Sequence, residues 1–424
     1  MKKVWIFSAL LAAGLVLSQV LPAVLGGSAR ALQETGRLLT MVGLAFIMIH
    51  VGYEFDIDKK NLREFGWDYV VAMTAAAFPW IFVTGYFLVV LMPPGAWRTY
   101  QGWSEILLAG RFAAPTSAGV LFSMLAAAGL SATWTFRKAR VLAIFDDLDT
   151  ILLMIPLTML MVGAAWQMGL VVLVMLLILY AAWRWLNHFV LPFTWPWVLG
   201  YATVIALNSE AIYHASLAIE QGVPVHIEVL LPAFALGCVM KPLNNPHADD
   251  VREGHQEGPE HPREQTVSTI VSGAFMFLVG LSMPLMFENP ASGASAPTTL
   301  SAIVPVPTWP IIIVHVLVVT VLSNLGKMFP LLCYRRQASV YERLALAISM
   351  WPRGEVGAGI LVVGLSYGLS GPIMTVALLS LSLNLLLTGA FILTVKALLR
   401  RHQVIHGSAG VASHAARRSH AMIQ

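Results

Sequence analysis

Two adjacent aspartates, Asp146 and Asp147, lie in a run of residues that is otherwise largely apolar from Val141 to Met161. A third acid, Asp149, follows within one helical turn. One carboxylate at the centre of a membrane helix costs about 3 kcal/mol on insertion scales, and a neighbouring carboxylate adds repulsion. We therefore expect the pair to do what only a buried charge can do, which is to bind and release a cation or a proton.

The composition indicates a membrane protein. The chain of 424 residues is 58% hydrophobic and only 11% charged, whereas a soluble domain carries about 25% charged residues. Most of its Lys and Arg lie in short loops beside apolar runs, so they predict membrane topology and no nucleic-acid partner. Cys238 and Cys333 match no zinc or redox spacing. No nucleophile–base or phosphate-loop pattern is present, so we expect neither an enzyme nor a cofactor.

The apolar runs predict an all-α polytopic protein embedded in the lipid bilayer, because several reach the roughly 20 residues that a membrane-spanning helix needs. Residues 1–31 could also be read as a signal peptide, since they have a basic start and a small-residue end; we interpret them as a retained span. About twelve transmembrane helices are expected, at residues 4–24, 36–55, 69–92, 104–130, 139–163, 167–188, 195–219, 225–241, 267–287, 309–334, 341–369 and 372–399.

Basic residues gather at one side of these spans if the number of crossings is even. The positive-inside rule then predicts a multi-pass protein of the inner (plasma) membrane with both termini in the cytoplasm. The clusters are Lys2 and Lys3; Lys59, Lys60 and Arg63; Arg137, Lys138 and Arg140; Arg335, Arg336 and Arg343; and Arg400 and Arg401.

Two stretches are polar. Residues 241–264 carry three histidines among acidic residues and predict a solvated cytoplasmic linker, with a pH-sensing loop or a weak metal site as the alternative. Residues 400–424 predict a disordered cytoplasmic tail whose basic residues weakly favour anionic lipid headgroups.

Proline and glycine interrupt the fourth and eleventh predicted spans near their midpoints, at Pro115 and Pro352. Backbone groups freed at that depth are tolerated only where they are buried in protein or line a hydrated cavity. Breaks at matching positions of two halves are the sequence mark of an inverted-repeat transporter. We therefore predict two inverted five-helix repeats. Their boundaries are residues 1–163 and 221–399, with spans six and seven between them at 164–220.

Lys327 lies in the tenth predicted span at a depth that permits contact with the aspartates. Counting about 1.5 Å per helical residue, it lies about 8 Å from the centre of its span, and Asp147 lies about 6 Å to the same side of its own. A lysine at that depth without an acidic partner is expensive. The alternative is that Lys327 extends to the membrane surface.

Taken together, these motifs resemble the cation/proton antiporter superfamily, and most of all bacterial sodium/proton exchangers with paired aspartates. The similarity rests on Asp-Asp at 146–147, Gly-Lys at 326–327 and Pro-Arg-Gly-Glu-Val-Gly at 352–357. It extends over about residues 36–395, and further segments that resemble the family are 41–56, 115–119, 232–237 and 277–281.

The resemblance implies a core domain that carries the ion site across the membrane against a panel domain that forms a homodimer. It implies that Asp147 carries the monovalent cation (Na⁺) and the proton in turn, and that Asp146 pairs with Lys327. The other implied roles are oxygen ligands or orientation from Thr116 and Ser117, and organisation of the second break and its funnel by Arg353 and Glu355.

Coupled binding of a cation and a proton at Asp147 is also chemically reasonable without the resemblance to the family. A cation or a proton that binds Asp147 neutralises the carboxylate, which lowers the cost of moving the site past a hydrophobic barrier. The empty, charged site resists that movement, so the two fluxes are coupled. Two acids and a titratable lysine leave room for more than one proton per cation, and we therefore expect electrogenic exchange.

Three charged residues depart from the family pattern: Asp149, Arg111 near the middle of the fourth span, and Glu210 in the seventh. One interpretation is a structural salt bridge from Arg111 to Asp149 or to Glu210. The other is an altered ion site, with a different cation selectivity or an anion held by Arg111.

The sequence therefore favours a secondary-active Na⁺ (or Li⁺)/H⁺ antiporter and leaves two alternatives. One is a potassium/proton exchanger or potassium-efflux system of the same fold. The other is a sodium-coupled symporter of a small anion that contacts Arg111.

Overall fold

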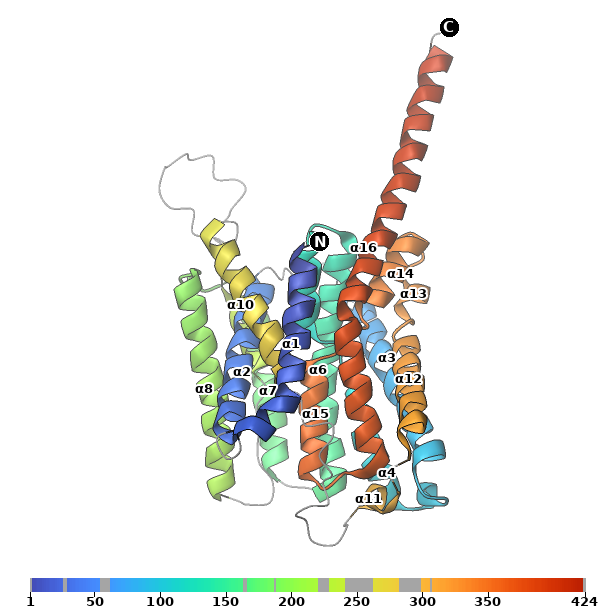
Figure 1. Ribbon diagram of the computed structural model, residues 1–424. Helices are drawn as coiled ribbons and strands as arrows, with labels where there is room; N and C mark the ends of the chain where they lie inside the picture. Colours follow the sequence, from blue (N-terminus) through green and yellow to red (C-terminus); the bar gives the residue numbers. More distant parts are fainter. Residues whose placement is uncertain are drawn as a thin grey trace.

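The protein is a bundle of long, roughly parallel helices (Figure 1). The computed structural model describes residues 2–25, 29–53, 62–162, 166–186, 188–219, 229–240, 262–281, 299–305 and 307–421. In these residues the only β-type pairing is an isolated bridge between Phe189 and Met240.

Ten of the twelve predicted spans correspond to one helix or to a helix with a short neighbour, and the spans at 104–130 and 341–369 each consist of two helices separated by a break. Within the described ranges, six helical segments are long and apolar enough to cross a membrane on length and composition alone. The helices are α1 (Lys2–Leu25), α2 (Ala29–Tyr53), α3 (Leu62–Tyr86), α4 (Tyr100–Gly110), α5 (Ala118–Ala127), α6 (Trp134–Val162), α7 (Trp166–Arg184), α8 (Trp195–Ile219), α9 (Leu230–Val239), α10 (Pro262–Leu281), α11 (Leu300–Ile303), α12 (Trp309–Gly326), α13 (Pro330–Cys333), α14 (Val340–Ser349), α15 (Glu355–Ser366) and α16 (Gly371–Ala421).

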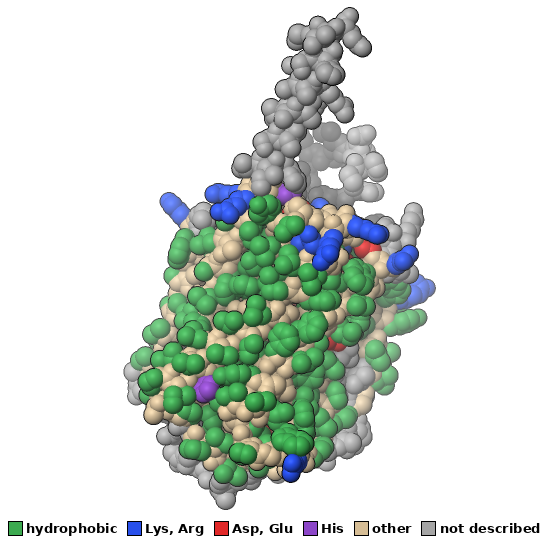
Figure 2. All heavy atoms as spheres, turned by 90° about the vertical axis from the view of Figure 1, so that its right-hand side faces the viewer, with side chains coloured by type: hydrophobic (Ala, Val, Ile, Leu, Met, Phe, Trp, Pro, Cys, Tyr) green, Lys and Arg blue, Asp and Glu red, His purple; other side chains and the backbone are tan. Residues whose placement is uncertain are grey.

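The surface agrees with a membrane setting. The flank of the bundle is largely hydrophobic, and Lys and Arg side chains gather at the end where α16 leaves it (Figure 2). Exposed side chains such as Val314, Leu317 and Val321 line the outer face of α12. We call the end where α16 leaves the bundle the basic end and the opposite end the outer end. The exposed residues of the basic end include Arg63, Arg137, Arg335, Arg336 and Arg400.

The structure describes the two predicted polar segments to different extents. Most of the predicted linker, residues 241–261, lies outside the described residues, as do Lys59 and Lys60. α16 is helical as far as Ala421, past the predicted end of the last span at residue 399, and the disordered state of the tail stays a prediction. Alanine and arginine, which recur in this segment, have high helix propensity.

Helix contacts in one half of the chain have equivalents in the other half. α1 packs along α10, and α2 packs along α9. If spans one to five correspond in order to spans eight to twelve, these two contacts are equivalents of each other. α3 against α6 and α12 against α16 form a second equivalent pair. This is the pairing that two repeats related by a two-fold axis in the membrane plane produce.

Glycines bring the backbones of the paired helices into direct contact. A Cβ atom on Gly280 of α10 would lie 2.3 Å from the carbonyl oxygen of Leu11 in α1, and one on Gly237 of α9 would lie 2.3 Å from that of Ile49 in α2. The facing residues are again glycines, Gly14 and Gly52. Because lipid offers no hydrophobic drive for helix association, such small-residue crossings supply the van der Waals contact instead.

We expect Gly237→Ala and Gly280→Ala each to destabilise the protein by about 1–3 kcal/mol, because the added methyl group forces two backbones apart. Thermal unfolding in detergent measures this as a fall in Tm. Gly200→Ala in α8 is the matched control, since a Cβ there meets nothing within 4 Å. Equal Tm values for all three variants would contradict the role of the glycine crossings.

Candidate ion-binding site

The two interrupted spans meet at their breaks in the middle of the bundle. The first consists of α4, a 3₁₀ turn at Arg111–Ala113 and α5; the second consists of α14 and α15. Ser117 donates its backbone N–H to the carbonyl oxygen of Pro352 at 3.0 Å, and the Thr116 hydroxyl donates to that of Met350 at 3.0 Å. The breaks therefore satisfy part of each other's backbone hydrogen bonding away from water.

Local sequence explains why the helices stop there. Pro115 and Pro352 have no N–H to continue a helix, and both are buried at the breaks. The Ser117 side chain caps α5 by accepting the N–H of Val120. Gly354 precedes α15, and a Cβ at that position would lie 3.1 Å from the Ser117 hydroxyl. The small residue therefore allows the two breaks to approach closely.

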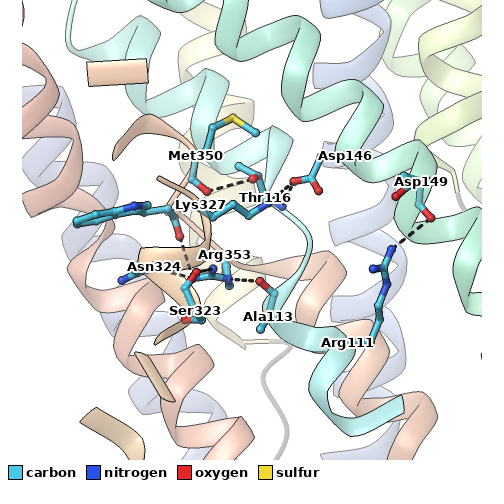
Figure 3. A network of polar contacts seen from close by, with 11 residues as sticks. Arg111, Ala113, Thr116, Asp146, Asp149, Ser323, Asn324, Lys327, Met350 and Arg353 are labelled. Atoms are coloured by element: carbon cyan, nitrogen blue, oxygen red, sulfur yellow. Dashed lines mark hydrogen bonds and ion pairs between the residues drawn. The ribbon is translucent and has the colours of Figure 1, made fainter. Parts of the chain in front are cut away.

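Asp146 and Lys327 form an ion pair at this crossing (Figure 3). Lys327 Nζ lies 2.6 Å from Asp146 Oδ2, and both side chains are fully buried. The predicted contact is therefore present, and the alternative that Lys327 reaches the membrane surface is wrong. The same Oδ2 also accepts the Thr116 N–H at 2.8 Å, so one carboxylate compensates an ammonium and a free amide at the start of α5.

Asp147 is also fully buried, one residue further along α6. Successive helical residues point about 100° apart, so its side chain leaves α6 in a different direction from that of Asp146. The sequence grouped Thr116 and Ser117 with these acids. The structure brings Thr116, Ser117 and Asp146 together at the crossing, with Asp147 as the next residue of α6. A hydroxyl that donates to a carbonyl keeps lone pairs with which it can bind a cation.

Arg353 binds the carbonyl ends at the crossing (Figure 3). Its guanidinium donates to the backbone oxygen of Ala113 at 2.9 Å, to that of Ser323 at 2.8 Å and to the Asn324 side chain at 2.7 Å. The predicted organising role of Arg353 thus has a geometric basis. Glu355 is the first residue of α15, and its side chain lies outside the described residues.

Arg111 lies beside Asp149 and not beside Glu210. Its Nη2 donates to the backbone oxygen of Asp149 at 3.3 Å, and its guanidinium stacks on the Trp80 ring at 4.8 Å. The predicted alternative of a bridge to Glu210 is wrong, because Glu210 of α8 forms an ion pair with Arg37 of α2. The two helices pack against each other, away from Arg111.

A second polar cluster, which the sequence analysis missed, lies nearer the basic end. Lys138 of α6 pairs with Asp68 at 2.8 Å and with Glu64 at 2.7 Å, both on α3. Tyr334, just after α13, donates its hydroxyl to Asp68 at 2.6 Å. The acids alternate with aromatic residues near the start of a span, and this pattern resembles an ordinary solvated helix end. Together with Asp146–Lys327, the cluster fixes α6 to neighbouring helices at two levels.

The sequence analysis also missed a polar contact between α12 and α16. Thr320 and Asn324 of α12 meet Ser380 and Asn384 of α16 at 2.9 and 3.3 Å. The i, i+4 spacing in both spans was the available signal, since it places each pair of polar residues on one helix face. Through Asn324, this contact joins the Arg353 network.

Two interrupted helices that cross beside buried acids, within a helical membrane bundle, define a secondary transporter of ions. A family model described as "Sodium/hydrogen exchanger, transmembrane" matches residues 3–400. The chain therefore belongs to the sodium/hydrogen exchanger family, whose members are cation/proton antiporters and not enzymes.

The fold is similar to that of the sodium proton antiporter MjNhaP1 from Methanocaldococcus jannaschii, solved at pH 8. The TM-score is 0.53, the sequence identity is 15%, and the match covers 92% of each chain. No curated protein matches the chain in sequence.

Removing Lys327 should leave Asp146 as an uncompensated buried charge. We expect Lys327→Met to destabilise the protein by about 3–5 kcal/mol, visible as a large fall in Tm in detergent. The double variant Lys327→Met, Asp146→Asn should recover much of this loss, because asparagine is neutral and still accepts the Thr116 N–H. A double variant as unstable as the sum of its single variants would contradict the ion pair as the link between α6 and α12.

Proposed function

We propose that the protein is an electrogenic sodium (or lithium)/proton antiporter that works by alternating access, with Asp147 as the site that the cation and the proton share. The main support is the position of Asp147. It is fully buried at the crossing of two broken helices, beside an Asp146 carboxylate that is already paired with Lys327 at 2.6 Å. Thr116 and Ser117 complete the site from the first break.

In this proposal the charge on Asp147 controls the movement of the core domain. A carboxylate in a water-excluded site interacts strongly with any cation, because the local dielectric constant is low. Binding of Na⁺, Li⁺ or a proton neutralises Asp147 and allows the site to cross, while the empty site stays where it is. No cofactor is needed beyond the transported ions.

The moving and fixed parts follow from the packing. We assign α3 to α6 and α12 to α16 to the core domain, because the ion pairs and hydrogen bonds around Asp146, Arg353 and Asp68 join them. The panel domain contains α1, α2, α9 and α10, which pack through the glycine crossings, and α8, which packs against α2. The inverted repeats at residues 1–163 and 221–399 each contribute helices to both domains. The basic end of the bundle faces the cytoplasm of the plasma membrane.

Arg111 favours cation antiport over symport of an anion. Its guanidinium is stacked on Trp80 and lies beside Asp149, close enough to interact electrostatically with both Asp146 and Asp149. Three acids within one turn of α6 repel an anion, so the surroundings of Arg111 suit a cation site.

Transport is tested with the purified protein in liposomes that contain a pH dye and hold an imposed proton gradient. We expect Na⁺ or Li⁺ to dissipate the gradient in the native chain. Asp147→Asn should abolish the response, because the neutral asparagine side chain offers no charge to a cation and takes up no proton. An imposed membrane potential should change the native rate if exchange is electrogenic.

The outcomes separate the alternatives. A response to K⁺ alone would replace the sodium assignment with a potassium/proton exchanger. Full activity of Asp147→Asn would contradict Asp147 as the shared site. A transport rate that does not depend on the membrane potential would contradict electrogenic exchange.

We also propose a homodimer through the outer flank of α2 and α8. The ion pair of Arg37 with Glu210 lies there together with His214, at 3.2 Å from Glu210. Arg37 and Glu210 are each about 12–14 Å along their helices from the outer ends, and the side chains of Arg37 and His214 are 44% and 67% exposed. Charges that face lipid at that depth are expensive, and a second copy of the chain would cover them.

Glu210→Ala should therefore weaken the dimer, because it leaves Arg37 without its counter-charge at the interface. We expect a shift from dimer to monomer of about tenfold in the equilibrium constant, equivalent to roughly 1.4 kcal/mol, measured by native mass spectrometry in mild detergent. Arg98→Gln, at an exposed arginine stacked on Trp97 at 4.7 Å, is the control. An unchanged distribution in Glu210→Ala would place the dimer contact elsewhere.

A further inference from the structure

Arg111 is a buried charge to which the transport mechanism gives no role. Its side chain is fully buried in the 3₁₀ turn just before the first break. Its Nε and Nη1 have no hydrogen-bond partner among the described residues. An uncompensated guanidinium in such surroundings is strongly destabilising, so something nearby has to balance its charge.

The guanidinium is held in place from two sides, of which Figure 3 shows the contact with Asp149. The Trp80 ring of α3 supports its face at 4.8 Å, and Trp80 is itself anchored by a hydrogen bond from Nε1 to the backbone oxygen of Leu107 at 2.8 Å. From α6, the backbone oxygen of Asp149 accepts from Nη2. A cation over an indole face is favourable and directional, so the charge is fixed in position.

The fixed charge lies among the acids of α6. Arg111 is close enough to interact electrostatically with the carboxylates of both Asp146 and Asp149. Asp146 already has its own counter-charge in Lys327 at 2.6 Å. Asp149 is the acid that remains, and it is buried, with 6% of its surface exposed. Asp147 lies between Asp146 and Asp149 in the sequence, one residue from the first and two from the second.

We propose that Arg111 is the fixed counter-charge of Asp149 and that this pair sets the affinity of the Asp147 site for Na⁺. The proposal rests on the proposed function in one respect, that the cation binds at Asp147. With Arg111 in place, Asp149 adds little net field at Asp147. Without Arg111, the additional negative charge attracts the cation; without Asp149, the additional positive charge repels it. A unit charge about 10 Å away in partly screened surroundings changes an ion affinity by about tenfold.

The experiment is a charge cycle on the purified full-length protein, with Na⁺ binding measured as stabilisation against heat at one alkaline pH. We expect Arg111→Met to lower the apparent Kd for Na⁺ about tenfold and Asp149→Asn to raise it about tenfold. The double variant Arg111→Met, Asp149→Asn should return close to the native Kd. Arg111→Lys keeps the charge and should stay nearer to native than Arg111→Met. Arg98→Met, which removes an exposed arginine stacked on Trp97, should leave Kd unchanged.

The opposite signs separate this proposal from a purely structural role. If Arg111 only held the fold together, both single variants would lose stability without opposite shifts in Kd, and the double variant would not recover. Shifts of the same sign, or a double variant far from native, would overturn the proposal. If Arg111→Met does not fold, Asp149→Asn and the double variant still decide: Kd must rise in the first and return in the second.

A parallel transport measurement keeps the two proposals apart. In liposomes, the KM for Na⁺ of each variant should shift in the same direction as its Kd, down in Arg111→Met and up in Asp149→Asn. The maximal rate should change less. If the native chain binds Na⁺ but exchanges no protons, the proposed function fails, while the binding cycle still tests the role of Arg111. If exchange is present and the cycle shows no opposite shifts, the role of Arg111 alone is overturned.

Discussion

Free backbone groups at the centre of a membrane bundle have to be compensated without water, and the structure around the crossing depends on this constraint. A broken helix exposes amides on one side of its break and carbonyls on the other, and each group left unpaired at that depth costs several kcal/mol. Asp146 accepts from Thr116 on the amide side. Arg353 donates to Ala113 on the carbonyl side. A negative charge therefore compensates the amide side of the first break and a positive charge its carbonyl side, and the positive charge also links the first break to the second.

This arrangement separates the charges that build the site from Asp147, the charge that we propose binds the transported ions. Lys327 and Arg353 make their shortest contacts with Asp146, with backbone carbonyls and with Asn324. Asp147 lies one residue beyond Asp146 on the same rigid helix. Because α6 is fixed both at Lys327 and at the Lys138–Asp68 cluster, a change in the charge of Asp147 need not disturb the scaffold that positions it.

The sequence predicted the helices and the main ion pair because both carry strong signals. Long apolar runs define spans, and an intramembrane lysine such as Lys327 requires an acid at the same depth, which pointed to the paired aspartates. The choice of Asp146 between the two came from the resemblance to the family. Partners of Arg111 were harder to predict. Asp149 and Glu210 both satisfied the charge argument, and hydropathy does not say which side of a span faces which neighbour. Thr320, Asn324, Ser380 and Asn384 were missed for a related reason: neutral polar residues in an apolar helix cost too little to stand out.

The two groups of helices differ in how they are held together, and this difference suits them to move against each other. The helices around α6 are joined by ion pairs and hydrogen bonds in addition to close glycine contacts such as that of Gly326 with Pro79, whereas α1, α2, α9 and α10 meet mainly through glycine crossings. Between the groups, the Phe275 ring of α10 lies against Gly119 of α5, with Leu44 of α2 beside it. An aromatic ring on a glycine can slide without breaking a polar contact at that point. In the mechanism that we propose, the charge on Asp147 then remains as the main electrostatic obstacle to movement, which is what coupling of a cation to a proton requires.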